Sequence, residues 1–316
     1  MHEFDKIARI ARIVGASARP KELVLGIGDD CATLDASALQ PGEQLVWTID
    51  AQIEGVHFRR ELLSWEDVGY RATVAATSDV LAMGARPIAA LAAWTTPREL
   101  DDDAVEGIAR GQRQACDALS IAIVGGNVSG AGELSITTTV LGATSHPIGR
   151  AGARVGDRLV VVGALGEASL GFSWLMRRGS DDGATRVVAA WRRPKVLLEE
   201  SRALAAIAHA MIDVSDGLAQ DVGHLARASG VRVRIDVAAL HARRHDETRE
   251  LAALLRAPLD DMELSGGEDY ALVAAVPQGV ALPAGADVIG AIEEGAGVSV
   301  VSPEGHALVP PAGFRH

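Results

Sequence analysis

The spacing of hydrophobic and polar residues changes along the chain and predicts a mixture of helices and strands. Hydrophobic residues three and four apart predict an amphipathic helix over residues 3–15. Residues 44–53 read as a strand, with Asp50 toward its end. Two longer helices are predicted over residues 64–84 and 101–119. The first half of the chain therefore combines both kinds of element.

Polar residues mark the starts of these two longer helices. Ser64 followed by Asp67 resembles a capping box, and Gly84 with Pro87 supplies the stop. Three aspartates, residues 101–103, fall in the first turn of the second helix, where the helix dipole favours negative charge. We interpret that run as a solvated helix start rather than a metal site.

The rest of the chain continues the mixture in an irregular order. Further strands are predicted at 120–126, 133–143, 158–163, 231–237, 270–276, 286–292 and 298–302, and further helices at 167–178, at 194–209 with Pro194 in the first turn, and from Gly217 to Gly230. A stretch rich in Pro, Gly and Arg, residues 146–157, reads as a connector. We therefore predict two α+β domains, residues 1–145 and 146–316, rather than a doubly wound sheet.

Composition and charge narrow the class of protein. Of the 316 residues, 48% are hydrophobic and 23% charged, which is typical of a globular chain. A formal net charge of −12 argues against a protein that binds the phosphate backbone of a nucleic acid. It does not exclude phosphorylated substrates, because bound divalent ions can reverse the local sign of the charge. No apolar run reaches the roughly 20 residues of a membrane span, and no signal peptide is evident. We expect a cytoplasmic protein that binds neither nucleic acid nor membrane.

The two cysteines, Cys31 and Cys116, suit a reducing compartment better than a disulfide scaffold. Cys31 follows an acidic pair, but the sequence offers no obvious histidine to activate it. We therefore expect a small buried thiol at this position rather than a nucleophile.

Acidic residues at turns and element ends are the strongest chemical signal. They sit beside Gly, Ser and Thr with apolar flanks, where a half-buried carboxylate needs a compensating cation. The three lysines (Lys6, Lys21 and Lys195) lie away from these motifs, so a metal is the favoured cation. The acids are Asp29, Asp30, Asp50, Asp79, Asp213, Asp216 and Glu268. Oxygen ligands select Mg²⁺, Mn²⁺ or Ca²⁺, and neither a P-loop nor a zinc-spaced His/Cys cluster occurs in the sequence.

Taken singly, each of these motifs has a structural alternative. In Asp213-Val-Ser-Asp-Gly217, either Ser215 or Asp216 caps the following helix, unless the two nearby acids share a cation. Asp29-Asp30 also suits a turn, and Asp79 also suits a helix residue satisfied by Ser78 or Arg86.

Three further positions remain open in the same way. Gly125-Gly126-Asn127 either approaches a phosphate or makes a common turn. Arg150 is either a fixed cation for an anionic ligand or an exposed connector residue, and His57 is either a packed neutral imidazole or a phosphate ligand.

Six ordered motifs give the chain a specific resemblance. They are Gly-Ile-Gly-Asp-Asp-Cys-Ala (26–32), Asp50 with Glu-Gly-Val-His-Phe (54–58), Ser-Asp-x-x-Ala-Met-Gly-Ala-x-Pro (78–87), Gly-Gly-Asn (125–127), Ile-Asp-Val-Ser-Asp-Gly-Leu (212–218) and Ser-Gly-Gly-Glu-Asp-Tyr (265–270). In this order and over nearly the whole chain, the sequence resembles the thiamine-monophosphate kinases. That family belongs to the superfamily of aminoimidazole-ribotide synthetase, selenophosphate synthetase and the hydrogenase-maturation dehydratase.

The resemblance implies an activity, a fold and a set of site residues. The activity is transfer of a phosphoryl group from ATP to thiamine monophosphate, assisted by several Mg²⁺ ions. The implied fold has an N-terminal domain whose sheet pairs with that of a second subunit in a homodimer, a C-terminal domain, and a site in the cleft between domains and subunits. The implied metal ligands are Asp30, Thr48, Ile49, Asp50, Asp79, Asn127, Asp213 and Asp216.

The same resemblance assigns residues to the two substrates. Gly126, Asn127, Arg150 and Ser215 are implied to contact the nucleotide, and His57, Glu268 and Phe314 to contact thiamine phosphate. Of all these residues, we expect Asp50, Asp216 and Arg150 to act most directly in catalysis.

The sequence departs from the family pattern at several positions. Asn127 stands where these kinases usually have aspartate, and Ile49 where they have a hydroxyl residue. Alternatives are another ATP-dependent enzyme of the superfamily or a non-catalytic nucleotide- or metal-binding homologue. The segment near the glycine loop lacks the reactive Cys and Lys of selenophosphate synthetase, and the chain ends in His316 rather than a cysteine tail. Both features favour the thiamine-monophosphate kinase.

Overall fold

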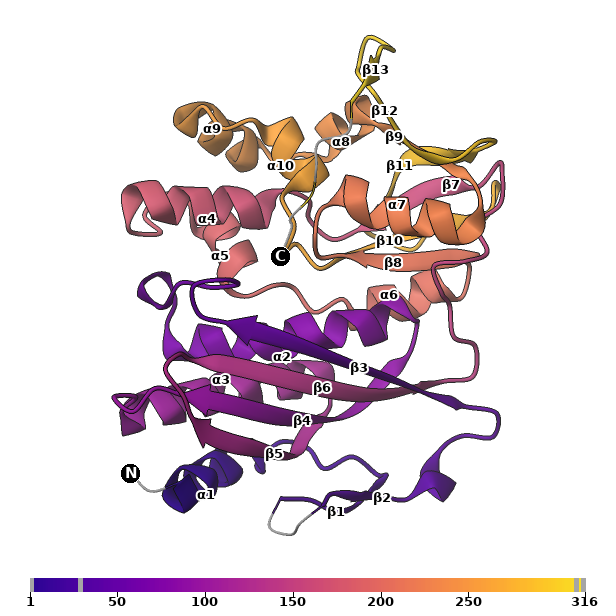
Figure 1. Ribbon diagram of the computed structural model, residues 1–316. Helices are drawn as coiled ribbons and strands as arrows, with labels where there is room; N and C mark the ends of the chain where they lie inside the picture. Colours follow the sequence, from indigo (N-terminus) through magenta and orange to yellow (C-terminus); the bar gives the residue numbers. More distant parts are fainter. Residues whose placement is uncertain (1–2, 28–30, 310–312, 314–316) are drawn as a thin grey trace. The chain divides into compact units, whose positions relative to one another are not determined.

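The computed structural model describes residues 3–27, 31–309 and 313, and the chain divides into two compact units. Unit 1 comprises residues 1–80 and 85–147, and unit 2 comprises residues 81–84 and 148–316. Each unit combines helices with a largely antiparallel sheet, so the α+β fold class predicted from the sequence is confirmed (Figure 1).

A four-stranded sheet forms the centre of unit 1. Its strand order is β3-β6-β4-β5, antiparallel except for the parallel pair β4 and β5. The elements of this part of the chain are α1 (Glu3–Val14), β1 (Leu23–Leu25), β2 (Thr33–Leu34), η1 (Ala36–Ala38), β3 (Gln44–Ile53), η2 (Arg60–Leu62), α2 (Trp65–Ala82), β4 (Arg86–Thr96), α3 (Asp102–Leu119), β5 (Ala122–Gly130) and β6 (Ser135–Thr144). Strand β3 therefore lies at one edge of this sheet and pairs only with β6.

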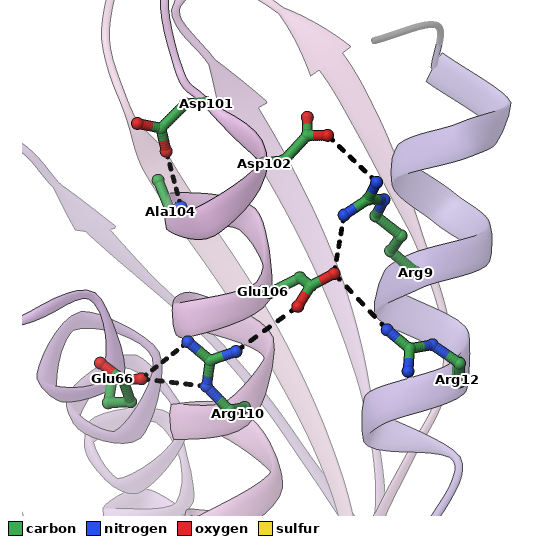
Figure 2. A network of polar contacts seen from close by, with 8 residues as sticks. All are labelled: Arg9, Arg12, Glu66, Asp101, Asp102, Ala104, Glu106 and Arg110. Atoms are coloured by element: carbon green, nitrogen blue, oxygen red, sulfur yellow. Dashed lines mark hydrogen bonds and ion pairs between the residues drawn. The ribbon is translucent and has the colours of Figure 1, made fainter.

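Charged side chains join α1, α2 and α3 (Figure 2). Glu106 on α3 pairs with Arg9 on α1 at 2.7 Å and with Arg110 at 3.6 Å, and Arg110 in turn pairs with Glu66 on α2 at 3.0 Å. Most of these side chains are partly exposed, so each pair stabilises the fold by under about 1 kcal/mol. Helix α1 packs against α3 and β5, and these ion pairs add only weak links between the helices.

Unit 2 contains a seven-stranded sheet in which three neighbouring strands, β7, β10 and β8, are buried almost throughout. Its order is β13-β12-β9-β11-β7-β10-β8, with β12 and β9 the parallel pair. The elements are β7 (Arg158–Val162), α4 (Glu167–Arg178), α5 (Thr185–Arg192), α6 (Leu198–Ala205), β8 (Ala210–Val214), α7 (Leu218–Ser229), β9 (Arg232–Asp236), α8 (Val237–Arg243), α9 (Asp246–Leu255), α10 (Leu259–Ser265), β10 (Ala271–Val276), β11 (Ala286–Glu293), β12 (Gly297–Val301) and β13 (Ala307–Leu308).

Alternate residues along the central strands of unit 2 enter two different cores. On β7, Leu159 and Val161 join a core that includes Val222 of α7. Val160 and Val162 point to the other face and pack in a core with Leu204 of α6. The continuous apolar runs in the sequence therefore reflect strands covered by helices on both sides.

The two predicted helix starts are confirmed. The Asp67 N–H donates to the Ser64 hydroxyl at 3.1 Å, and the Ser64 N–H donates to the Asp67 carboxylate at 3.2 Å. At the start of α3, Asp101 is the N-cap residue and its carboxylate accepts the Ala104 N–H at 2.8 Å.

Several elements differ from the sequence prediction. Strand β4 was not predicted, because its residues are apolar on both faces and follow directly on a helix-stop signal. The helix expected from Pro194 to residue 209 is shorter: α6 begins at Leu198 and ends at Ala205. Helices α5, α8, α9 and α10 were also missed, since each is short.

The thiols fit the sequence analysis in part. Both cysteines are free, and Cys116 is buried, which raises the pKa of its thiol to about 12. Cys31 is exposed, so the expectation of a buried thiol there was wrong. Within the described residues, none of the helices has the length and hydropathy needed to span a membrane.

Candidate active site

Thr48 and Asp50 lie on one face of β3, because side chains two residues apart in a strand point the same way. Both are half-buried. The Thr48 hydroxyl donates to the Asp79 carboxylate at 2.6 Å, which joins the strand to the last turn of α2. Three of the predicted metal ligands therefore come from one neighbourhood of unit 1.

Ile49 faces away from these oxygen ligands. Its side chain is 68% exposed, on the opposite face of β3 from Thr48 and Asp50. Only the backbone carbonyl of Ile49 offers a hard ligand, so its part in metal binding stays a prediction.

Gly126 and Asn127 lie on β5, next to β4. A Cβ on Gly126 would lie 2.0 Å from the Ala92 carbonyl oxygen, so strand packing alone requires glycine there. Asn127 is exposed, and its side-chain N–H donates to the Ser129 hydroxyl at 2.9 Å. The glycine therefore has a structural reason besides any approach to a phosphate.

A small cavity of about 60 Å³ adjoins these two residues. Apolar residues of α1, among them Ile7 and Ile10, line one part of it. Gln112 of α3 also lines it; this side chain is fully buried, and its amide nitrogen and oxygen have no hydrogen-bond partner in the described part of the chain. The sequence analysis missed Gln112, because a single glutamine on a helix carries no local signal.

The hydrogen bonds around His57 define its neutral tautomer. The Ile53 N–H donates to Nδ1 of His57 at 3.1 Å, so the ring proton lies on Nε2. The half-buried imidazole is therefore held through Nδ1, in a state in which Nε2 is a donor.

In unit 2 the structure joins two motifs that lie 50 residues apart in the sequence. The Glu268 N–H donates to the Ser215 carbonyl at 2.8 Å, and the Tyr270 N–H donates to the Val214 carbonyl at 2.9 Å. Gly267, the residue before Glu268, has φ +64°, and a Cβ there would lie 2.6 Å from the Ser215 carbonyl oxygen. Residues 213–217 and 265–270 thus form one double loop at the ends of β8 and β10, which are neighbouring strands.

The start of α7 differs from the predicted cap. The N-cap residue is Gly217, so neither Ser215 nor Asp216 occupies that position. Instead Asp221, inside the first turn, reaches back with one carboxylate oxygen to the N–H groups of residues 215–217. The sequence analysis missed Asp221, because it reads as an ordinary acid near a helix start.

Asp221 lies in a strongly acidic neighbourhood. Burial raises the pKa of its carboxyl group to about 7, and the negative charge of Asp213 adds to this shift. Asp216 also contributes a repulsive charge, and its carboxylate accepts a hydrogen bond from the Gln220 side chain at 3.0 Å. The carboxylates of Asp213, Asp216 and Asp221 thus lie close enough to one another for their negative charges to repel.

Glu268 faces aromatic side chains that the sequence analysis did not use. The indole N–H of Trp191 donates to the Glu268 carboxylate at 3.2 Å, and the ring of Trp191 lies 5.2 Å from that of Phe172. Glu268 itself has φ +60°, an uncommon conformation for a residue other than glycine. A strained backbone at this loop is consistent with a functional site.

Of the remaining predicted residues, the structure describes Arg150 but not Asp29, Asp30 or Phe314. Arg150 is exposed, and its carbonyl accepts a hydrogen bond from Ser229 at 3.0 Å. Asp29, Asp30 and Phe314 lie outside the described residues. Among the residues that the structure does describe, no three His, Cys, Asp or Glu side chains form a ready-made metal site.

The fold and these motifs define the class of protein. Residues 28–144 match the model of the AIR synthase related protein N-terminal domain, and residues 154–303 match that of the C-terminal domain. The chain therefore belongs to the AIR synthase related protein family.

Within that family, the chain is similar to the thiamine-monophosphate kinases. It is 35% identical to the enzyme of Mycobacterium tuberculosis over 302 residues, covering 93% of this chain and 87% of the relative. It is 32% identical to the thiamine-monophosphate kinase of Aquifex aeolicus over 293 residues, covering 92% of each chain.

Solved structures give the same result. The structure of AaThiL complexed with AMPPCP and TMP matches with a TM-score of 0.82 and 31% identity, covering 99% of this chain and 96% of that one. The thiamine-monophosphate kinase of Stenotrophomonas maltophilia matches with a TM-score of 0.82 and 32% identity, covering 98% of each chain.

Proposed function

We propose that this protein is a thiamine-monophosphate kinase, which transfers the γ-phosphoryl group of ATP to thiamine monophosphate and forms thiamine diphosphate. The observation that carries this proposal is the similarity, over nearly the whole of both chains, to AaThiL complexed with AMPPCP and TMP. The curated relatives that share the name support it across several bacterial species.

The reaction needs little help from a general base. The acceptor is a phosphate monoester whose second pKa is about 6, so its oxygen is largely ionised at neutral pH. The barrier arises from bringing two polyanions together in line. A site for this reaction therefore has to neutralise charge and fix orientation.

The oxygen donors of the site fit Mg²⁺, which neutralises and aligns phosphate oxygens when bound. In unit 1, Thr48 and Asp50 share a strand face, and the Thr48 hydroxyl contacts Asp79 at 2.6 Å. In unit 2, Asp213 and Asp216 crowd together with Asp221 at the start of α7. Binding of several Mg²⁺ ions is part of the proposal, and the proposed ligands are Asp30, Thr48, Ile49, Asp50, Asp79, Asn127, Asp213 and Asp216.

The substrates have separate proposed contacts. We assign the nucleotide to Gly126, Asn127, Arg150 and Ser215. His57 suits the phosphate of thiamine monophosphate, because its Nε2–H is a donor while Nδ1 is already engaged. Glu268 and Phe314 complete the thiamine side, and the buried indole of Trp191, which is only 1% exposed, holds the Glu268 carboxylate through its N–H group.

We further propose that the protein is a homodimer joined through unit 1. Strand β3 lies at the edge of its sheet and exposes Leu45, Trp47 and Ile49, which are 54%, 73% and 68% exposed. A long apolar edge strand favours aggregation of a lone chain unless another chain covers it.

We also propose a cytoplasmic location, because the free thiols of Cys31 and Cys116 suit a reducing compartment.

The proposed function is tested by incubating the purified protein with ATP, Mg²⁺ and thiamine monophosphate and measuring thiamine diphosphate and ADP. We expect both products in equal amounts. The Asp216→Asn and Asp79→Asn variants should lose turnover, because each removes a proposed ligand charge, while the circular-dichroism spectrum stays unchanged.

A matched control is Asp261→Asn, which neutralises an exposed acid in the first turn of α10 and should retain wild-type activity. The proposal is wrong if the wild-type protein binds ATP yet forms no thiamine diphosphate under conditions in which an established kinase does so. Full activity of both Asn variants would remove the metal-ligand assignment.

A further inference from the structure

Asp221, which the sequence analysis did not single out, gathers several backbone hydrogen bonds in unit 2. One oxygen, Oδ2, accepts three consecutive backbone N–H groups: those of Ser215 at 3.0 Å, Asp216 at 3.1 Å and Gly217 at 3.1 Å. The Asp221 N–H in turn donates to the Gly217 carbonyl at 3.0 Å. The side chain is only 4% exposed, so water contributes little to these contacts.

This arrangement fixes the backbone that carries two proposed metal ligands. Three N–H donors aimed at one oxygen allow the loop little freedom, because rotation of any one peptide group would break a hydrogen bond to that oxygen. Asp213 is the penultimate residue of β8, and Asp216 lies within the segment 215–217 that Asp221 contacts. The spacing of their carboxylates therefore depends on Asp221.

The hydrogen bonds to Asp221 also determine which groups of residues 213–217 are available to a ligand. Backbone N–H groups before a helix commonly bind anions such as phosphate. Here the N–H groups of residues 215–217 are directed to Asp221, inside the protein. The groups of this loop that remain available to a ligand are therefore side chains: the carboxylates of Asp213 and Asp216 and the hydroxyl of Ser215.

We propose that Asp221 is a positioning residue for metal binding. Its carboxylate holds the backbone of residues 215–217 in place, so that Asp213 and Asp216 are positioned to bind the Mg²⁺ that phosphoryl transfer requires. This inference rests on the proposed function. It concerns a residue that touches neither substrate and acts only through the loop. Groups that orient metal ligands typically change metal affinity by about 10–100-fold when they are lost.

The test compares Asp221→Ala and Asp221→Asn with the matched control Asp157→Asn. Asp157 is also an aspartate of unit 2 that is 4% exposed, and it accepts a backbone N–H, that of Arg154, at 2.8 Å. It lies at the start of β7 and contacts His209 rather than the metal-ligand loop. Its loss should therefore affect the stability of unit 2 without affecting the loop.

Two measurements are made on each full-length variant. The first is the Mg²⁺ concentration that gives half-maximal thiamine diphosphate formation at saturating ATP and thiamine monophosphate. The second is the binding of Mn²⁺, used as a spectroscopic probe, followed by electron paramagnetic resonance in the presence of a non-hydrolysable ATP analogue.

We expect Asp221→Ala to raise the half-maximal Mg²⁺ concentration and to weaken Mn²⁺ binding by about tenfold or more. Asp221→Asn should fall between this variant and the wild type, because its amide oxygen keeps part of the hydrogen bonding to residues 215–217 without the charge. If Asp221→Ala does not fold, Asp221→Asn alone provides the comparison. Asp157→Asn should match the wild type in both measurements.

Several results would overturn the proposal. One is a folded Asp221 variant with wild-type metal dependence, and another is a variant whose kcat falls while its metal affinity is unchanged. An equal loss of metal affinity in Asp157→Asn would also overturn it, because the effect would then follow from destabilised unit 2. A wild-type protein that binds Mn²⁺ tightly but forms no thiamine diphosphate would instead contradict the proposed function.

Discussion

Asn127 is a proposed metal ligand at a position where the family resemblance implies aspartate. An amide keeps an oxygen ligand but carries no charge, whereas the resemblance implies an aspartate at this place. The side chain is exposed on β5 and donates to Ser129 at 2.9 Å, so a carboxylate would fit without burying a charge. The substitution therefore offers a way to weigh charge against geometry in metal binding.

We predict that Asn127→Asp lowers the Mg²⁺ concentration needed for half-maximal activity. One added charge near a bound cation at a partly exposed site contributes about 1 kcal/mol, or roughly a fivefold change in affinity. Asn127→Ala should change the requirement in the opposite direction, because it removes the oxygen. Activity titrated with Mg²⁺ measures both changes, and identical curves for all three proteins would show that residue 127 is not a ligand.

For single residues, the sequence identified site candidates that motifs mark. It missed residues whose hydrogen-bond or packing partners lie far away in the sequence. Asp79 stood out as an acid with polar and apolar flanks and Thr48 was implied by the family resemblance, and the structure pairs them. Asp221 did not, because nothing nearby in the sequence shows that its carboxylate turns back to residues 215–217. Trp191 and Gln112 were missed for the same reason, since their significance depends on tertiary neighbours.

Among the elements, prediction succeeded where periodicity or capping was explicit. Strand β3 has the predicted bounds, and α2 and α3 begin within one residue of their predicted starts. Strand β4 lacks alternation because it pairs on both sides, with β5 and β6, and is mostly buried. An apolar run of this kind does not distinguish a central strand from a continuing helix by pattern alone.

The cap of α3 allows a prediction at the scale of one element. Asp101 accepts the Ala104 N–H at 2.8 Å, whereas its neighbour Asp102 makes a partly exposed ion pair with Arg9 at 3.1 Å (Figure 2). We expect Asp101→Ala to lower the free energy of unfolding by about 1 kcal/mol, because a helix N–H loses its partner. Asp102→Ala is the control and should cost under about 0.5 kcal/mol.

Urea denaturation of the two variants gives the comparison. A larger loss in Asp102→Ala than in Asp101→Ala would mean that the ion pair between α1 and α3 stabilises the fold more than the cap does. Neither residue belongs to the proposed site, so catalytic activity at moderate temperature should persist in both.

For the whole molecule, the two-domain α+β organisation followed from the irregular order of helices and strands. The exact boundary after residue 145 stays a prediction, as does the joint use of ligands from both halves of the sequence. Each unit contributes its own group of oxygen donors, around Thr48 and Asp79 in one and around Asp213 and Asp216 in the other. Within the described residues, neither group contains three His, Cys, Asp or Glu side chains arranged to hold a metal ion.

The proposed dimer is the property of the whole molecule that a substitution tests most directly. Leu45 and Trp47 project from the outer face of the edge strand β3, opposite the face that carries Thr48 and Asp50. The double variant Leu45→Glu/Trp47→Glu introduces two charges into this apolar surface. If a second chain covers it, burial of those charges becomes unfavourable, and light scattering after size exclusion should show a monomer where the wild type is a dimer.

The control for this experiment is Val155→Glu, which places a charge on an apolar residue of unit 2 that is 62% exposed and lies outside β3. It should leave the dimer intact, and both variants should keep the wild-type circular-dichroism spectrum. A monomeric wild type, or a double variant that remains dimeric at micromolar concentration, would contradict the assignment of β3 to the interface. Because the outer residues of β3 alternate with Thr48 and Asp50, loss of the dimer should also lower activity, although neither substituted side chain is a proposed ligand.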